Sequence, residues 1–505
     1  MATFTRKNAW NNDGTFNNPD LLWYAKAVEQ MQSRSLNDKT SWWFFAAIHG
    51  NRWIDIPAPP NVPTIPLPSG NIRNQYWAQC QHGTWFFLPW HRGYLYAIED
   101  ILREIVQNLG GPVDWALPYW NYFGQGNQFQ IPPAFTEQQL PDGTLNSLFV
   151  NARYGPNNDR SIFIPLSAWG INQNCQQNLF YTGDQPDFFG GVEIGFEHSG
   201  YENRGSIESN PHNFVHGAIG GQDFQGVGGL MSNPNTAAID PVFYLLHCNI
   251  DRMWASWNAE GKNNSNDLNW LNGPITNGDR KFYMPKPDAT PWQYTPGMVN
   301  SINQLDYSYD DLSSGPLPEA ISRNELRLRS FGSKFVEIKN LREMDKKTKS
   351  ELVGANSGSI ILGASGLRST VKLDSKGWNS IAESIGKAFR GGSEVISSDN
   401  IPDEVFLQLE GIKGKEDSIV CSVSVNNQYA GHISLFGLQN ASTVDSPHGG
   451  SGLTIRIDIT KIIDRLVIDH EIDVNSLDVL IQPINIISEG NDLTIDRISI
   501  YRNVQ

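Results

Sequence analysis

Four apolar segments with helical spacing each carry a histidine on the face that should be buried. One such helix would be ordinary packing. Four are too many for an apolar core, because buried imidazoles need polar partners and facing imidazolium rings would repel. Neutral imidazoles bound to metal ions resolve this conflict, and helix bundles build metal sites in this way. The histidines fall into two groups, His49, His82 and His91, then His212, His216 and His247.

Flanking residues predict where the helices of the first group begin and end. Residues 40–49 form a short apolar helix that ends at His49. Residues 89–108 form a longer helix, with Pro89 near its start and Gly110 just past its end. His91 lies on the apolar face of this second helix, so both helices direct an imidazole into the core.

The second group lies on two further helices. Asn210 is predicted to cap the first of them and Pro211 to occupy its first turn, which places His212 and His216 four residues apart on one face. Such a pair alone is weak evidence for a metal site. Asp240 and Pro241 are predicted to begin the other helix, whose inward face consists of Phe243, His247, Ile250 and Trp254.

All six candidate ligands are nitrogen donors. The absence of carboxylates from both groups disfavours magnesium, calcium and di-iron carboxylate sites. Three histidines for each metal ion suit copper or zinc, and counting residues does not separate the two.

Composition limits the partners and the compartment. The formal net charge of −15 argues against nucleic acid as a partner. The four cysteines include no CxxC pair and so indicate neither a disulfide framework nor a zinc finger. The N-terminus has no apolar signal segment, and no stretch is long enough to span a membrane. We therefore expect a cytoplasmic protein, with export by another route left open.

The hydrophobic pattern changes along the chain. Residues 1–310 have helical periodicity and long loops, which predicts a mainly α domain, and residues 311–330 read as a linker. After the linker, short segments such as 453–459 and 419–425 alternate with period two. This pattern predicts a C-terminal β-sandwich over residues 331–505.

Three segments resemble the copper motifs of tyrosinases and polyphenol oxidases. CQHGTWFFLPWHRGYLYAIE (80–99) resembles the first motif, and ESNPHNFVHG (208–217) with DPVFYLLHCNIDRMW (240–254) resembles the second. LDYSYDD (305–311) resembles the Tyr-x-Tyr segment that closes the catalytic domain of plant-type members. The β-rich remainder is similar to their C-terminal shielding domain. The resemblance covers roughly residues 1–310.

The resemblance implies a fold and a chemistry. It implies a four-helix bundle around two copper ions, CuA held by the first histidine group and CuB by the second. The copper pair would bind O2 and oxidise o-diphenols to o-quinones, with small phenols as the partners of the protein. Some members also hydroxylate monophenols. Zinc is redox-inert and could not do this.

Two residues near the histidines suggest monophenol chemistry. In tyrosinase-like members, residues matching Glu208 and Asn213 hold a water that deprotonates the phenol, whose free pKa is about 10. The alternative is that Glu208 complements a helix N-terminus and Asn213 is exposed. Cys80 and His82 form the C-x-H spacing that carries a thioether in fungal members, with a buried thiol as the alternative. Cys248 should point away from the metal ions.

The expected substrate pocket departs from the family in two places. Leu246 replaces a histidine that often precedes the third CuB ligand, and Pro234 stands where plant-type members have a phenylalanine gate. Phe243 and Gly217 are also expected at the pocket, and Phe243 and Phe87 should pack on the ligand rings. Removal of the C-terminal domain should raise activity, and Phe436 is a candidate to plug the pocket.

Other functions stay open at this point. A catechol oxidase or an o-aminophenol oxidase would lack the monophenol step. A haemocyanin-like O2 carrier would use the same copper pair without forming quinones, and a zinc hydrolase would need only one three-histidine site. The remaining histidines have no metal-like neighbours and are expected at the surface or in loops, namely His198, His432, His448 and His470.

Overall fold

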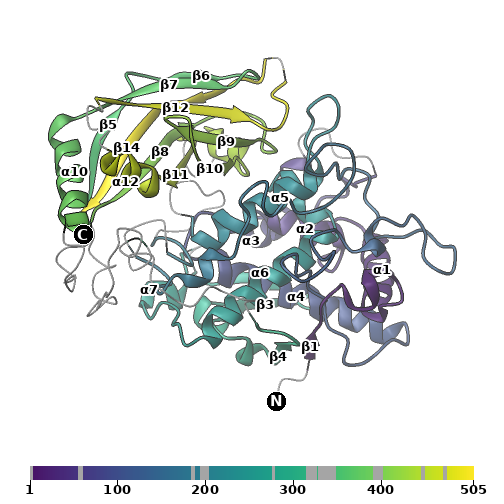
Figure 1. Ribbon diagram of the computed structural model, residues 1–505. Coiled ribbons are helices and arrows are strands. Elements are labelled where there is room, and N and C mark those ends of the chain that lie inside the picture. The colour runs from purple at the N-terminus through teal and green to yellow at the C-terminus, as the bar shows by residue number, and fades with distance from the viewer. Residues whose placement is uncertain are drawn as a thin grey trace. The chain divides into compact units, whose positions relative to one another are not determined.

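In a computed structural model, the chain folds into two compact units, Met1–Gly315 and Pro316–Gln505 (Figure 1). The structure describes residues 4–54, 61–183, 188–193, 204–275, 279–313, 327, 349–390, 402–444, 450–469, 475–488 and 490–504. Most of the predicted linker, 311–330, lies outside these residues, as do His198, His448 and His470. Among the described residues, no helix is long and apolar enough to cross a membrane.

The first unit is mainly helical, in agreement with the sequence. Its helices are α1 (Pro19–Gln32), α2 (Trp42–His49), α3 (Gly70–Tyr76), α4 (Phe87–Asn108), α5 (Asn213–Gly220), α6 (Val242–Ala259) and α7 (Leu268–Asn272). Its strands form two small pairs, β1 (Phe4–Arg6) with β4 (Tyr307–Tyr309) and β2 (Phe282–Pro285) with β3 (Pro291–Tyr294).

Side-chain caps determine where several of these helices begin. The hydroxyl of Ser41 accepts a hydrogen bond from the backbone N–H of Phe44 at the start of α2. At the start of α6, a carboxylate oxygen of Asp240 accepts from the N–H of Val242 at 2.9 Å, as the sequence predicted. Nearly all of α6 is buried, so its histidine lies inside the core.

The prediction that Asn210 caps the helix of the second histidine group is wrong. The backbone of Asn210 is extended, and α5 begins only at Asn213, after a wide helical turn over Glu208–His212 that contains Pro211. The side chain of Asn210 accepts from the N–H of Asn172 and donates to the carbonyl of Gly170. The side-chain oxygen that would cap the helix therefore already accepts a hydrogen bond from a distant loop.

The described residues of the second unit form an eight-stranded antiparallel sheet. Its strand order is β10 (Gln428–Ser434), β9 (Val420–Val425), β12 (Ser476–Pro483), β7 (Leu367–Leu373), β5 (Lys349–Ala355), β14 (Arg497–Val504), β8 (Glu404–Ile412) and β11 (Leu453–Asp458). β6 (Ile360–Leu362) and β13 (Leu493–Ile495) form a separate pair. The described residues of this unit also form the helices α10 (Ser375–Arg390), α11 (Leu438–Ser442) and α12 (Thr460–Ile468).

This single sheet replaces the predicted β-sandwich. Its two end strands approach each other, since a Cβ atom on Gly431 of β10 would lie 3.6 Å from the side chain of Ile457 on β11. The sheet therefore curls towards a barrel. Alternating side chains are common to both architectures, so period-two patterning alone could not separate them.

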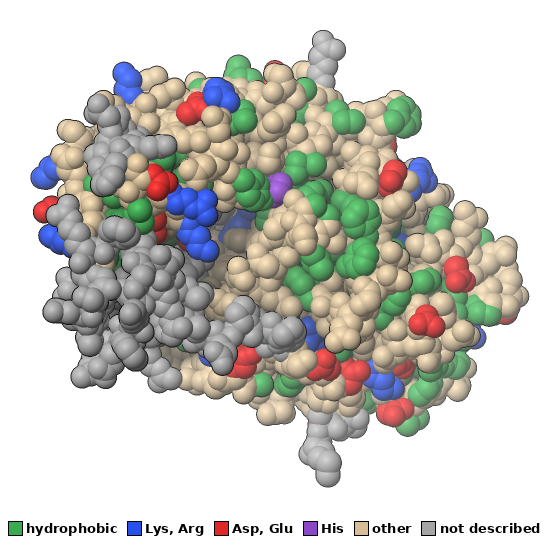
Figure 2. Space-filling model, in the orientation of Figure 1, with side chains coloured by type: hydrophobic (Ala, Val, Ile, Leu, Met, Phe, Trp, Pro, Cys, Tyr) green, Lys and Arg blue, Asp and Glu red, His purple; other side chains and the backbone are tan. Residues whose placement is uncertain are grey.

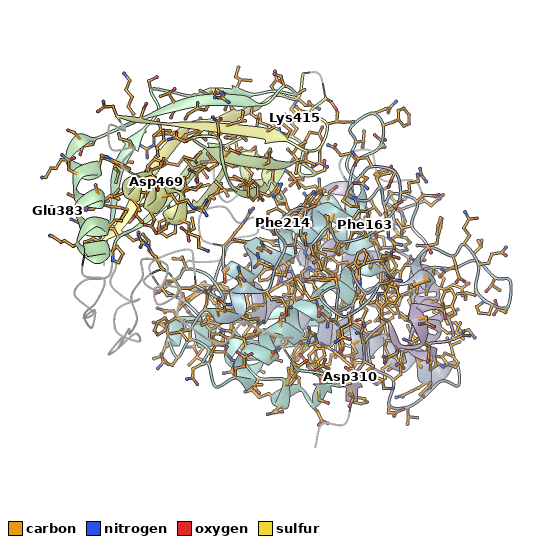
Figure 3. All side chains as sticks on the ribbon, in the orientation of Figure 1. Phe163, Phe214, Asp310, Glu383, Lys415 and Asp469 are labelled. Atoms are coloured by element: carbon orange, nitrogen blue, oxygen red, sulfur yellow. The ribbon has the colours of Figure 1, made fainter. Side chains whose placement is uncertain are left out.

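Charged side chains of both signs lie at the surface of the second unit. Figure 3 labels Glu383, Lys415 and Asp469 at its surface, and all three are exposed. Acidic and basic side chains both occur across the face shown in Figure 2. The net negative charge of the chain is therefore not concentrated in one acidic patch on that face.

Candidate metal centre

The first histidine group comes from two helices and from the loop that precedes the second of them. His49 is the last residue of α2, His91 lies near the start of α4, and His82 lies in the loop that precedes α4. All three are buried, and their ligand atoms lie within 4.8 Å of one another together with the sulfur of Cys80. The sequence did not predict that Cys80 would be a fourth possible donor in this group.

The second group gathers from the turn before α5, from α5 and from α6. The Nε2 atoms of His212 and His216 each lie 3.3 Å from Nε2 of His247. All three rings are buried. The two groups adjoin, because the rings of His91 and His247 stack with their centroids 4.4 Å apart.

Backbone carbonyls fix the tautomers of three rings. Nδ1 of His49 lies 2.8 Å from the carbonyl oxygen of Pro234, Nδ1 of His91 is at the same distance from that of Phe87, and Nδ1 of His216 from that of Met231. A carbonyl oxygen can only accept, so each Nδ1 carries the proton. Each Nε2 then presents a lone pair, as metal ligation requires.

Burial also keeps the rings neutral. It lowers the pKa of His91 well below the ordinary value, and the neighbouring His49 adds to this effect. Burial and the surrounding histidines likewise lower the pKa of His212, His216 and His247. Two imidazole nitrogens 3.3 Å apart repel unless a proton or a cation lies between them. The donor set therefore fits metal ions bound by neutral imidazoles.

Aromatic rings surround the ligands as the sequence predicted. Phe243 lies 4.1 Å from the ring of His247 and 4.8 Å from that of His49, measured between centroids. Phe87 lies 4.6 Å from His91 and 4.8 Å from His212. Each phenylalanine thus contacts both histidine groups and fills space that water would otherwise occupy.

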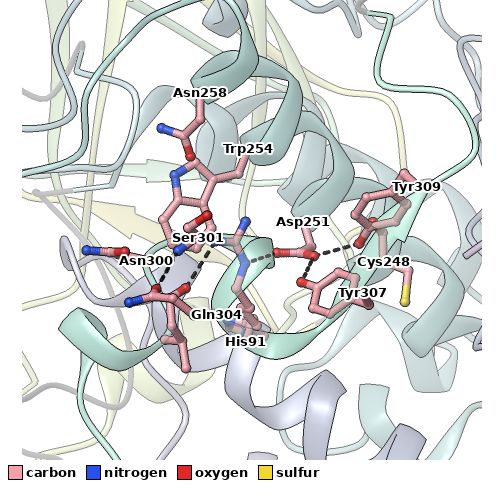
Figure 4. A network of polar contacts seen from close by, with 12 residues as sticks. His91, Cys248, Asp251, Trp254, Asn258, Asn300, Ser301, Gln304, Tyr307 and Tyr309 are labelled. Atoms are coloured by element: carbon pink, nitrogen blue, oxygen red, sulfur yellow. Dashed lines mark hydrogen bonds and ion pairs between the residues drawn. The ribbon is translucent and has the colours of Figure 1, made fainter. Parts of the chain in front are cut away.

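A buried ionic network holds together the helices that carry His91 and His247 (Figure 4). Asp251 on α6 accepts hydrogen bonds from Arg92 on α4 at 2.5 Å and from the hydroxyls of Tyr307 and Tyr309 on β4. Arg6 on β1 bonds to the same carboxylate. The arginines hold the pKa of Asp251 below its usual range, although burial alone would raise it. The Tyr-x-Tyr segment therefore closes the unit directly onto the metal-bearing helices.

Glu208 is buried next to the first group. Both of its carboxylate oxygens accept from the N–H of Gly83, the residue after His82, at 2.9 and 3.0 Å. Burial raises the pKa of Glu208 to about 7, against the opposing charge of Arg204 and the hydrogen bond from Gly83. The Gly83 contact could not be predicted, because any residue except proline offers such an N–H.

The amide of Asn213 lies between a ligand and an arginine. It is 2.8 Å from Nδ1 of His212 and 3.2 Å from a guanidinium nitrogen of Arg204. Arg204 can only donate, which favours turning the amide oxygen towards it. A metal ion on Nε2 of His212 instead requires Nδ1–H, and so requires the amide oxygen to face His212. Asn213 is buried, so the exposed position considered from the sequence is wrong.

The other predicted residues take varied positions. Pro234, Gly217 and Leu246 are buried, and Pro234 contacts the first group through its carbonyl. The Cys80 sulfur lies 3.3 Å from Nδ1 of His82, and burial raises the pKa of its thiol. Cys248 belongs to neither ligand group, and His432 lies beside Tyr429 on β10.

Comparisons with known proteins agree with this centre. The family model of the common central domain of tyrosinase matches residues 39–260, and a domain of unknown function matches 349–503. Tyrosinase HcTyr1 of Hahella sp. (strain CCB-MM4) is 32% identical over 96% of this chain and 97% of its own length. Catechol oxidase B of Solanum tuberosum is 31% identical over 47% of this chain and 39% of its own.

A solved structure shares the fold. Latent apple tyrosinase is 20% identical, with a TM-score of 0.56 over 100% of this chain and 98% of that one. The expectation of copper rather than zinc is confirmed, since the family matched by these comparisons binds two copper ions and the two histidine groups fit CuA and CuB. The chain belongs to the tyrosinase family, a type-3 dicopper family of oxidoreductases that act on phenols.

Proposed function

We propose that this protein is a tyrosinase that both hydroxylates monophenols and oxidises o-diphenols to o-quinones. Two copper ions bound by the two histidine groups would supply electron transfer between the phenol and O2. In this proposal α2, α4, α5 and α6 act as a four-helix bundle around the pair. The observation that carries the monophenol step is the buried carboxylate of Glu208.

Glu208 is suited to act as a base near neutral pH. A pKa of about 7 means that a large fraction of the group is ionised at neutral pH and that its conjugate acid is not too strong. Its carboxylate is held in place by the N–H of Gly83, so it is fixed relative to the adjacent His82. Glu208 therefore accepts the phenol proton directly or through a water.

Asn213 would be the second residue that holds this water, together with Glu208. Its amide contacts His212 and so lies at the second histidine group, whereas the carboxylate of Glu208 lies at the first. In this proposal the two polar groups hold the water from the sides of the two histidine groups. The buried thiol of Cys80 would restrain His82, either by contact or by a thioether bond.

The test compares a 4-alkylphenol with the matching catechol, using copper-loaded protein and the variant Glu208→Gln. We expect the variant to lose about 10²-fold or more in the monophenol step and to keep most of its catechol oxidation. Glu383→Gln, at an exposed carboxylate on α10, is the matched control. Activity on the catechol alone in the wild type would make the protein a catechol oxidase. Reversible O2 binding without quinone would make it a carrier.

A further inference from the structure

One short segment contacts a ligand from each histidine group. We call Leu230–Thr236 the bridging loop; it follows α5 and precedes α6. Its Met231 carbonyl accepts from Nδ1–H of His216 at 2.8 Å, and its Pro234 carbonyl accepts from Nδ1–H of His49 at 2.8 Å. The two carbonyls are only three residues apart, yet one serves the second group and the other serves the first.

Two other histidine ligands have a described partner on Nδ1, and each partner lies close to that histidine in the sequence. His91 donates to the Phe87 carbonyl one turn earlier in α4. His212 lies beside the amide of its neighbour Asn213. Neither contact links the two groups. The bridging loop therefore binds one ring of each group through a backbone carbonyl.

Close backbone contacts hold the bridging loop at both of its sides. A Cβ atom on Gly50, the residue that follows α2, would lie 2.6 Å from Cα of Asn235 and 2.9 Å from the Pro234 oxygen. A Cβ atom on Gly220, which ends α5, would lie 2.4 Å from the backbone nitrogen of Ser232. All three distances are shorter than those that real Cβ atoms show, so only glycine allows this approach.

The hydroxyl of Thr236 closes the bridging loop on itself. It donates to the carbonyl of Leu230 at 2.8 Å and lies 3.3 Å from that of Asn233. Thr236 is only partly buried, and none of its described hydrogen bonds involves a histidine. Its hydroxyl thus fixes the curvature of the segment without direct access to the metal centre.

We propose that the bridging loop sets the geometry of the copper pair as one unit, with Thr236 as a positioning residue. A displacement of the loop should turn His49 and His216 together, so a change on the CuA side should also weaken CuB. This inference rests on the dicopper site assigned above, and copper content tests it separately from phenol oxidation.

The experiment measures copper per chain, copper affinity by chelator competition, and the EPR signal of isolated Cu(II). Thr236→Val removes the hydroxyl at nearly constant volume. We expect it to lower the affinity for both copper ions by roughly tenfold. Thr236→Ser keeps the hydroxyl and should stay within about twofold of the wild type. Gly50→Ala should lose copper from both groups, so that little isolated Cu(II) is seen.

The control is His82→Ala, which removes a CuA ligand that the bridging loop does not contact. It should keep one copper ion per chain with a clear EPR signal. If Gly50→Ala behaves in the same way, or if Thr236→Val weakens one ion only, the proposal is wrong. If Gly50→Ala fails to fold, the two Thr236 variants decide. Wild-type protein with two copper ions but no phenol oxidation would refute the proposed function and leave this inference standing.

Discussion

Replacing Glu208 by glutamine in copper-free protein should change how stability depends on pH. The pKa of this carboxyl rises from 4.5 to about 7 on folding, chiefly because the group is buried. At about 1.4 kcal/mol for each tenfold change in proton affinity, ionising Glu208 costs about 3 kcal/mol more in the folded than in the unfolded chain. The side chain is 1% exposed, so solvent screening reduces this little.

The sign follows from proton linkage. The folded state binds the proton more tightly, so the stabilisation is complete below about pH 4.5 and is lost as the pH rises through about 7. The amide that Glu208→Gln introduces cannot ionise, but its oxygen can still accept from the N–H of Gly83. The difference in free energy of unfolding, variant minus wild type, should therefore increase by roughly 2 to 3 kcal/mol between pH 5 and pH 8.

Urea unfolding followed by tryptophan fluorescence measures this difference at the two pH values. Glu383→Gln, at an exposed carboxylate, should show no such gain. A constant difference between wild type and Glu208→Gln from pH 5 to pH 8 would mean that Glu208 titrates near its ordinary pKa. The reasoning that makes it a base near neutral pH would then fail.

Four further results are expected. Asp251→Asn removes the carboxylate that pairs with buried Arg92 and leaves Arg6 with Glu99 alone, and it should cost about 3–5 kcal/mol in thermal unfolding; a loss below about 1 kcal/mol would deny the network a structural role. Gly93→Ala should destabilise by about 1–3 kcal/mol, since its Cβ would lie 2.2 Å from the ring of Tyr294. By contrast, Gly386→Ala in α10 meets open space and should stabilise by about 0.5–1 kcal/mol; equal effects at the two glycines would contradict the packing described. Removing residues 320–505 should raise phenol oxidation if the C-terminal unit shields the site, and unchanged activity in a folded truncation would count against shielding.

The ligands of the metal centre could be predicted because their signal is local. A histidine on the apolar face of a helix is visible from helical spacing, and His49, His91 and His247 are all found there. The groups that orient them carry no such signal. The Met231 and Pro234 carbonyls differ from any other carbonyls only in where the folded chain places them.

The errors in the fold prediction have similar causes. The pattern Asn-Pro is typical of a helix start, but the side chain of Asn210 forms hydrogen bonds to the backbone of Gly170 and Asn172 instead. The alternating strands were predicted correctly, while their pairing depends on contacts between residues far apart, such as β10 with β9 and β12 with β7. Single-strand periodicity contains no information about which strands become neighbours.

The parallel pairing of β1 with β4 has a consequence for synthesis on the ribosome. Phe4 pairs with Tyr307 and Arg6 with Tyr309, so the strand made first has to wait for one made about 300 residues later. Until then Arg6 lacks the carboxylate of Asp251 and the rings of the Tyr-x-Tyr segment. At a typical elongation rate of about 5–20 residues per second, the waiting time is about 15 to 60 seconds. Over that interval the nascent chain presents an unpaired basic strand, and native assembly of the catalytic unit is a late event.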